Sequence, residues 1–161
     1  MGLVLDAGAL AESLADLKAR GRTVALANGH FDLLHVGHLR YLQAAAAEAD
    51  VLVVAINDDD SVARLKGPGR PVVPAVERAE LLAALKPVDF VIVFAGDSPA
   101  PLLALLQPDV HCKGTDYGTP ERVPEYSVVA AYGGRTVLVG DPKDHATSDL
   151  IARVRSLPGK T

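Results

Sequence analysis

Short apolar runs alternate with helix-like segments along almost the whole chain, and this alternation constrains the fold more than any other feature. The run at residues 51–56 is continuously apolar, as expected for a strand that is buried on both faces. Parallel strands need long crossover connections, which helices commonly supply. The pattern therefore predicts an α/β fold: a doubly wound, Rossmann-like, five-stranded parallel sheet with flanking helices, forming a single domain over residues 1–161.

The expected elements follow from these patterns. Strands are predicted at 23–28, 51–56, 90–94, 109–112 and 136–139. Helices are predicted at 7–20, 36–48, 75–85, 99–106, 120–132 and 147–155. The connection at 57–74 is read as one long loop rich in Gly and Pro. A loop of this length inside a compact domain is more often functional or mobile than idle.

Composition and charge narrow the partners and the compartment. A formal net charge of −4 and a pI near 5.7 argue against non-specific nucleic-acid binding, because that requires a basic surface. No apolar stretch approaches the roughly 18 residues of a membrane span, and residues 1–14 lack the pattern of a signal peptide. The one cysteine, Cys112, cannot form an internal disulfide and indicates a reducing compartment. We therefore expect a cytoplasmic protein with no nucleic-acid or membrane partner.

A polar string at residues 28–38 lies where the first predicted strand gives way to the second predicted helix. It reads Asn-Gly-His-Phe-Asp-Leu-Leu-His-Val-Gly-His. Gly29 and Gly37 lack a Cβ and allow a ligand to approach the backbone. His35 and His38 are three residues apart at a helix N-terminus, where free N–H groups and the helix dipole attract phosphate. Taken alone, such a pair is equally well explained as two histidines at a helix end that bind no ligand.

Other chemistries find less support in the sequence. Two histidines are too few for a zinc site, and His30, His111 and His145 lie at spacings that specify none. The chain has no P-loop and no dinucleotide-binding glycine motif after its first strand. It also lacks the Gly-x-Ser-x-Gly turn of serine hydrolases.

The full string Gly-x-Phe-Asp-x-x-His-x-Gly-His resembles the signature of the nucleotidyltransferase superfamily, the cytidylyltransferase-like α/β family with the HxGH motif. The resemblance continues over about residues 22–155, through segments at 64–67, 69–71, 77–78, 81–85, 88–90, 97–99, 108–110 and 113–117. Together these segments are similar to the adenylyltransferase domain of bifunctional ADP-heptose synthases. The resemblance implies transfer of AMP from ATP to a sugar 1-phosphate, namely heptose 1-phosphate, with release of pyrophosphate.

The resemblance also implies roles for individual residues. Catalytic roles fall to His35, His38 and Lys66, although Lys66 could instead be a solvated surface lysine. The implied nucleotide-binding residues are Asn28, Gly29, Phe31, Asp32, His35, Gly37, His38, Lys66, Arg78, Lys113, Thr147 and Ser148. The implied acceptor-binding residues are Asp32, Lys113 and Asp116. No residue is assigned as a metal ligand, because Mg²⁺ is expected to bind with the nucleotide and to keep much of its water.

Three of these roles have a structural alternative. Arg78 carries a donor fork that suits a phosphate, but it could instead pair with Glu77 or Glu80 on the helix surface. Asp32 is expected either to orient the motif or to approach the metal. Asp116 is expected either to bind a sugar hydroxyl or to act in a turn.

Departures from the family pattern keep other substrates open. The family's Ser-Thr-Thr or Ser-Thr-Ser element at the last helix reads Ala146-Thr147-Ser148 here, which retains two hydroxyls and an expected N-cap. His30 occupies a position that is commonly small or Cys in the heptose branch. The alternatives are a cytidylyltransferase acting with CTP on glycerol 3-phosphate or another polyol or sugar phosphate, and a non-catalytic nucleotide-binding module. Glycerol-3-phosphate cytidylyltransferases carry Arg-Thr-Glu-Gly before this element, whereas this chain has Asp-Pro-Lys-Asp at 141–144.

Although the net charge of the chain is negative, we expect the site itself to be basic. Five cationic residues fall on segments predicted to meet at the carboxyl edge of the sheet, beside the two histidines; they are Arg64, Lys66, Arg70, Arg78 and Lys113. The partners are therefore expected to be small phosphate anions, ATP or CTP together with a phosphorylated sugar or polyol. Dimers are common in the family, so the resemblance also implies a homodimer.

Overall fold

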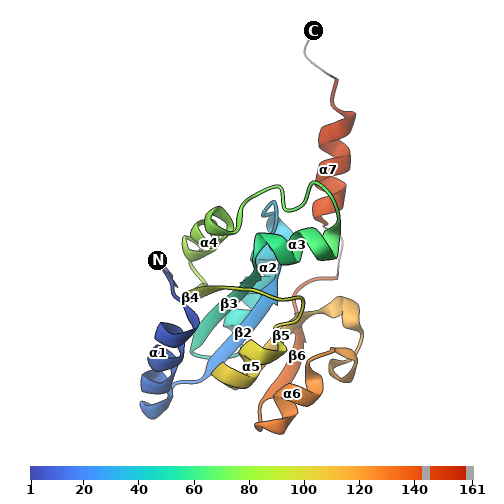
Figure 1. Cartoon of the computed structure of the whole chain (residues 1–161). Helices are drawn as coiled ribbons and strands as arrows, with labels where there is room; N and C mark the ends of the chain where they lie inside the picture. Colours follow the sequence, from blue (N-terminus) through green and yellow to red (C-terminus); the bar gives the residue numbers. More distant parts are fainter. Residues whose placement is uncertain (143–145, 159–161) are drawn as a thin grey trace.

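The computed structural model describes residues 1–142 and 146–158. Six parallel strands form one sheet in the order β1-β4-β3-β2-β5-β6, seen near the centre of Figure 1. The strands are β1 (Leu3–Val4), β2 (Val24–Gly29), β3 (Val51–Asn57), β4 (Phe90–Phe94), β5 (Val110–Gly114) and β6 (Arg135–Val139). The predicted parallel α/β architecture is confirmed, with one strand more than expected.

The additional strand is β1, a two-residue edge strand. Leu3 pairs with Phe90 and Val4 with Val91, and both β1 side chains are exposed. A strand of two exposed residues has no repeating apolar pattern, so the sequence contains no signal for it.

Helices cover both faces of the sheet. They are α1 (Ala7–Ala19), α2 (Val36–Ala46), α3 (Asp59–Lys66), α4 (Ala75–Ala83), α5 (Ala100–Leu106), α6 (Tyr126–Ala131) and α7 (Thr147–Ser156). Leu42 of α2 and Leu82 of α4 share one core layer with Val54 of β3, whereas Leu10 of α1 and Leu103 of α5 lie in the opposite layer. In the described residues, every helix is too short or too polar to cross a membrane.

The expected loop at 57–74 contains a helix, α3, which corrects the sequence-based prediction. The Asp58 carboxylate accepts from the Ser61 backbone N–H at 2.9 Å and so caps the N-terminus of α3. Asp59 and Asp60 lie in its first turn, and Arg64 and Lys66 in its last turn, as the helix dipole favours. These acids were the missed signal for a helix start.

The segment expected as one helix at 120–132 is also different. It is divided into a 3₁₀ turn at Pro120–Arg122 and the short helix α6, because Val123 at their junction has extended backbone angles. Figure 1 shows α7 extending away from the sheet, and this helix has no buried residue.

Candidate active site

A cleft lies at the switch point of the sheet. After β2 the chain runs to β3 and β4 on one side, and later returns to place β5 against the other side of β2. In open α/β sheets, ligands bind at such a point, outside the carboxyl ends of the strands. The cleft has a volume of about 570 Å³, within the usual range of small-molecule sites.

The cleft brings together every predicted site residue except Arg78. Its walls contain Asn28, Gly29, Phe31, Asp32, His35, Gly37, His38, Lys66, Lys113, Asp116, Thr147 and Ser148. These residues come from the ends of β2 and β5 and from the starts or ends of α2, α3 and α7. Residues far apart in the sequence therefore converge on one concave surface.

The two motif histidines stack on each other at the start of α2. Their ring centroids are 3.8 Å apart, with 22° between the planes. The His35 backbone N–H donates to Nδ1 of His38 at 3.4 Å, so a neutral His38 carries its proton on Nε2. Burial and the nearby His35 lower the pKa of His38 to about 4. Near neutral pH, His38 is therefore an uncharged hydrogen-bond donor.

Phe31 is buried beside this pair and supports it. Its ring lies 5.2 Å from that of His38 and 6.3 Å from that of Tyr41. Tyr41 also lines the cleft, and its hydroxyl donates to the Cys112 carbonyl oxygen at 2.7 Å. The sequence analysis missed Tyr41, although its position three residues after His38 on the same helix was a usable signal.

The β5 side of the cleft presents an amide, an ammonium and a carboxylate. The Asn28 Oδ1 accepts from Nε2 of the buried His111 at 2.9 Å and lies 3.5 Å from the Lys113 Nζ. Lys113 Nζ also lies 5.1 Å from the centre of the Tyr117 ring, a cation–π arrangement. Asp116 lies on the next turn, at the same wall.

Asp32 connects three walls of the cleft. Its buried carboxylate accepts from the backbone N–H groups of Val72 and Val73, at 2.9 Å each, and from Arg70 Nε at 2.7 Å. Its backbone carbonyl accepts from the Thr147 hydroxyl at 2.7 Å. Burial acts to raise the pKa of Asp32, but the Val72 and Val73 amides and Arg70 hold it below its ordinary value. Of the two predicted roles, these contacts match orientation of the motif.

The backbone on both sides of Asp32 is strained. Phe31 has φ 50° and Leu33 has φ 52°, in the left-handed region that bulky residues rarely adopt. Such positions cost on the order of 1–3 kcal/mol each and cluster at functional sites. The hydrogen bonds that Asp32 accepts hold the backbone in this left-handed conformation.

Three of the five expected cations line the cleft. Lys66 ends α3, Arg70 lies in the following loop and Lys113 lies on β5. Arg64 instead pairs with Asp97 at 2.9 Å on an exposed surface. Burial, followed by Lys66, Arg78, Arg70 and Lys113, lowers the pKa of His30 to about 4. The cleft is therefore locally basic within an acidic protein.

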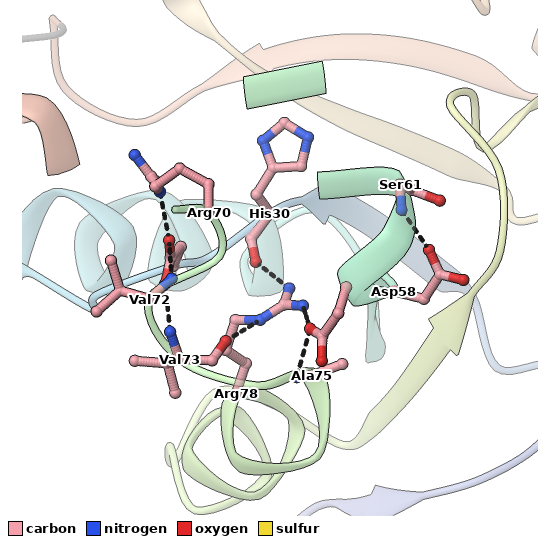
Figure 2. Close-up of polar contacts among 10 residues, drawn as sticks. His30, Asp58, Ser61, Arg70, Val72, Val73, Ala75 and Arg78 are labelled. Atoms are coloured by element: carbon pink, nitrogen blue, oxygen red, sulfur yellow. Dashed lines mark hydrogen bonds and ion pairs between the residues drawn. The ribbon is translucent and has the colours of Figure 1, made fainter. Parts of the chain in front are cut away.

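Arg78 lies behind the cleft, not at its surface, and here the structure differs from the sequence-based expectation. Its side chain has no exposed area and donates to the carbonyl oxygens of Val73 and His30 and to the Asp59 carboxylate, as Figure 2 shows. The alternative pairings with Glu77 or Glu80 are not formed, because Arg78 points inward from α4. Each of the three guanidinium nitrogens donates to the protein, and the side chain has no exposed surface from which to contact a phosphate in the cleft.

The start of α7 completes the cleft. The N-cap is Ala146, so Thr147 and Ser148 occupy the first helical positions and do not cap the helix as expected. Both still line the cleft, but the Thr147 hydroxyl proton is already donated to Asp32. Residues 143–145, including His145 and part of the 141–144 segment, lie outside the described part of the chain.

The side chains of the cleft suit a metal ion whose ligands are mainly substrate phosphates and water. Across 1–142 and 146–158, no three His, Cys, Asp or Glu side chains are grouped to hold a metal ion. The Asp32 oxygens are occupied by Arg70 and two backbone amides. Mg²⁺ binds few protein ligands where substrate phosphates and water supply the rest.

We expect the thermal stability to fall as the pH is lowered below about 6.5. Burial lowers the pKa of His30 and His38 to about 4 and that of His111 to about 3, so from their ordinary value of 6.5 down to about 4 the unfolded chain binds more protons than the folded one. This contribution is complete above pH 6.5 and is lost as the pH falls. Measuring Tm from about pH 7.5 to 5 checks it, with His111→Gln expected to show a smaller decrease. A constant Tm in both proteins would contradict the expectation.

Comparison with known proteins identifies relatives over most of the chain. A family model described as cytidylyltransferase-like matches residues 26–150. The bifunctional protein HldE of Geotalea uraniireducens is 49% identical over 148 residues, which cover 92% of this chain and 30% of that protein. The chain thus spans about a third of the length of the curated relatives it matches.

Two solved structures have similar folds. A lipopolysaccharide core biosynthesis protein from Thermoplasma volcanium is 29% identical, with a TM-score of 0.65, covering 76% of this chain and 100% of that one. Pantoate-beta-alanine ligase from Francisella tularensis, solved with beta-gamma ATP and beta-alanine, is 13% identical with a TM-score of 0.62, covering 96% and 77% of the two chains. The second similarity concerns the fold alone.

Proposed function

The chain belongs to the cytidylyltransferase-like family and is a nucleotidyltransferase, and we propose that it transfers AMP from ATP to a sugar 1-phosphate. An oxygen of the acceptor phosphate attacks the α-phosphorus of ATP, the bond from that phosphorus to the bridging oxygen breaks, and pyrophosphate leaves. The acceptor oxygen is already anionic near neutral pH, so no general base is needed. The work of the protein is to position two anions and stabilise the transferring group.

One observation carries this proposal: two stacked imidazoles and three cationic side chains face one cleft at the switch point. Such an arrangement is suited to hold two phosphorylated molecules side by side. His35 and His38 would contact the α- and β-phosphates, Lys66 would reach the β- and γ-phosphates, and Lys113 the acceptor phosphate. In His38, the donor to a phosphate oxygen would be the Nε2–H, because Nδ1 accepts from the backbone.

Mg²⁺ is proposed to enter bound to the triphosphate. When bound, it would mask triphosphate charge and favour departure of pyrophosphate. The cationic side chains of the cleft would stabilise the phosphates alongside the metal ion.

The acceptor is proposed to be heptose 1-phosphate. The resemblance of the segments at 64–117 to ADP-heptose synthases supports it, as does the similarity to a lipopolysaccharide core biosynthesis protein. We further propose that residues 1–161 form one catalytic domain, active as a homodimer in the cytoplasm. Size-exclusion chromatography with light scattering tests the assembly.

Pyrophosphate release tests the proposed reaction. The chain would be incubated with each of ATP and CTP, combined with heptose 1-phosphate, hexose 1-phosphates or glycerol 3-phosphate, with MgCl₂ present. Release with ATP and heptose 1-phosphate alone supports the proposal. Release with CTP and glycerol 3-phosphate would indicate a cytidylyltransferase, and no release with any pair would indicate a nucleotide-binding module.

Lys66→Ala is expected to lower kcat/KM for ATP roughly 10- to 100-fold, the value of one charge-assisted hydrogen bond. Because Lys66 is exposed, Tm should stay nearly constant. The matched control is Lys86→Ala, which removes another exposed lysine that lies outside the cleft. Equal kinetics in the two variants would make Lys66 a solvated surface residue.

A further inference from the structure

Arg78 is the largest side chain that is fully buried in the described residues. Burying a guanidinium is costly unless its N–H groups are paired. Here Nε donates to the Val73 carbonyl at 2.9 Å, Nη1 to the His30 carbonyl at 2.6 Å and Nη2 to Asp59 Oδ1 at 2.7 Å. Figure 2 shows this fork at the centre of the contacts.

The three acceptors belong to three different segments that surround the cleft. His30 directly follows β2, and its ring lines the cleft. Val73 lies in the connection between α3 and α4, and its N–H donates to Asp32. Asp59 begins α3 and also accepts from the Ala75 N–H at 2.8 Å, which ties α3 to the start of α4.

Through Asp59, Arg78 determines where α3 starts relative to the histidine motif. Lys66 lies at the other end of that helix, about 10 Å along its axis at 1.5 Å per residue. Through Val73, Arg78 also holds the loop that carries Arg70. The two cations on this wall of the cleft are thus both placed by segments that Arg78 binds.

We propose that Arg78 is a positioning residue, which sets the distance between the Lys66 and Arg70 wall and the His35 and His38 wall without touching substrate. A planar fork can bind three acceptors from three segments at once, whereas a lysine has a single nitrogen. This inference rests on the proposed function, because it concerns how the same cleft holds its phosphates. A shift of about 1 Å in such groups can cost on the order of 10²-fold in rate.

The partial exposure of the Arg78–Asp59 pair allows the positioning role of Arg78 to be tested separately from its effect on folding. Asp59 keeps 47% of its side chain exposed while Arg78 is fully buried, so the pair is only half removed from water. Because Asp59 keeps contact with water, the loss of Arg78 does not leave a fully buried unpaired charge, which would be strongly destabilising. Arg78→Met therefore can leave a folded protein whose cleft walls are no longer held at a fixed distance.

The test compares Arg78→Met and Arg78→Lys with the wild type in the pyrophosphate-release assay, with kcat and KM for ATP measured separately. We expect KM for ATP to rise about 10-fold or more in Arg78→Met, with a lower kcat, and Arg78→Lys to recover part of both. A merely structural role would lower the folded fraction and hence the apparent kcat, and would leave KM unchanged. That result would overturn the proposal.

A second variant keeps the proposal testable if Arg78→Met does not fold. Asp59→Asn retains an Oδ1 acceptor but loses the charge, so a smaller rise in KM is expected. The matched control is Arg64→Met, which removes a cation of α3 that pairs with Asp97 outside the cleft. A rise in KM in Arg64→Met equal to that in Asp59→Asn would overturn the specific role of the Arg78–Asp59 pair.

Calorimetric binding of pyrophosphate separates this inference from the proposed reaction. If the wild type releases no pyrophosphate with any substrate pair, the proposed reaction fails, but binding still reports the geometry of the cleft. Weaker pyrophosphate binding in Arg78→Met, partly restored in Arg78→Lys, supports positioning. Equal dissociation constants in all variants would overturn it.

Discussion

His38→Ala is expected to lower kcat by on the order of 10²–10³, the cost of losing one donor to the charge that develops in the transition state. The structure gives this donor a defined form. Nδ1 of His38 accepts from the His35 backbone, and a pKa of about 4 keeps the ring neutral, so Nε2 carries the proton. Stacking on His35 and contact with Phe31 hold the ring in place before substrate binds.

The measurement is steady-state pyrophosphate release with saturating ATP and acceptor. His38→Asn is the informative partner variant, because its amide can still donate and should recover part of kcat. Circular dichroism and Tm establish that both variants are folded. Turnover near that of the wild type in His38→Ala would remove this residue from the chemistry.

Asp32→Ala is expected to cause the second large loss, in activity and stability together. The change leaves the Val72 and Val73 amides and the Arg70 Nε without their acceptor. A buried donor left unpaired costs about 1–3 kcal/mol, and less is expected for each of these partly buried donors. The strained backbone at Phe31 and Leu33 also loses a group that holds it. Displacement of the loop carrying Arg70 should reduce kcat/KM by on the order of 10²-fold.

Urea unfolding and steady-state kinetics of the same samples check this expectation. Asp97→Ala is the matched control, because it breaks an exposed ion pair with Arg64, which is typically worth about 0–1 kcal/mol. Because the pKa of Asp32 is below its ordinary value, its contribution is present above about pH 3.8 and is lost as the pH falls further. Wild-type stability and kcat/KM in Asp32→Ala would show that the loop needs no anchor.

Much of the fold was predictable because its signals are local. Strands β3 and β4 are continuous apolar runs, and their expected bounds agree with the structure within one residue. Strand β1 was not predictable, since two exposed residues form a strand only because β4 offers them a free edge. Helix α3 was missed although its acidic start and basic end are local signals, because Gly and Pro nearby suggested one long loop.

The residues around the cleft divide in the same way. The motif at 28–38 was readable because its chemistry lies in consecutive residues. Tyr41 also lines the cleft and was missed, because the signal for it is its spacing of three residues from His38 on α2 and not its residue type. Arg70 was identified only as a basic residue, because its partner Asp32 is 38 residues away in the sequence.

The sequence by itself determined the parallel α/β class, the histidine motif and the family. Only the tertiary structure decided which cations face the cleft. Lys66, Arg70 and Lys113 line it, whereas Arg78 is buried against His30, Val73 and Asp59, although all four are basic residues expected at the same edge. The physical reason is that a cationic side chain is stable inside the protein only where hydrogen-bond acceptors surround it. For Arg78, these acceptors come from segments that only folding brings together.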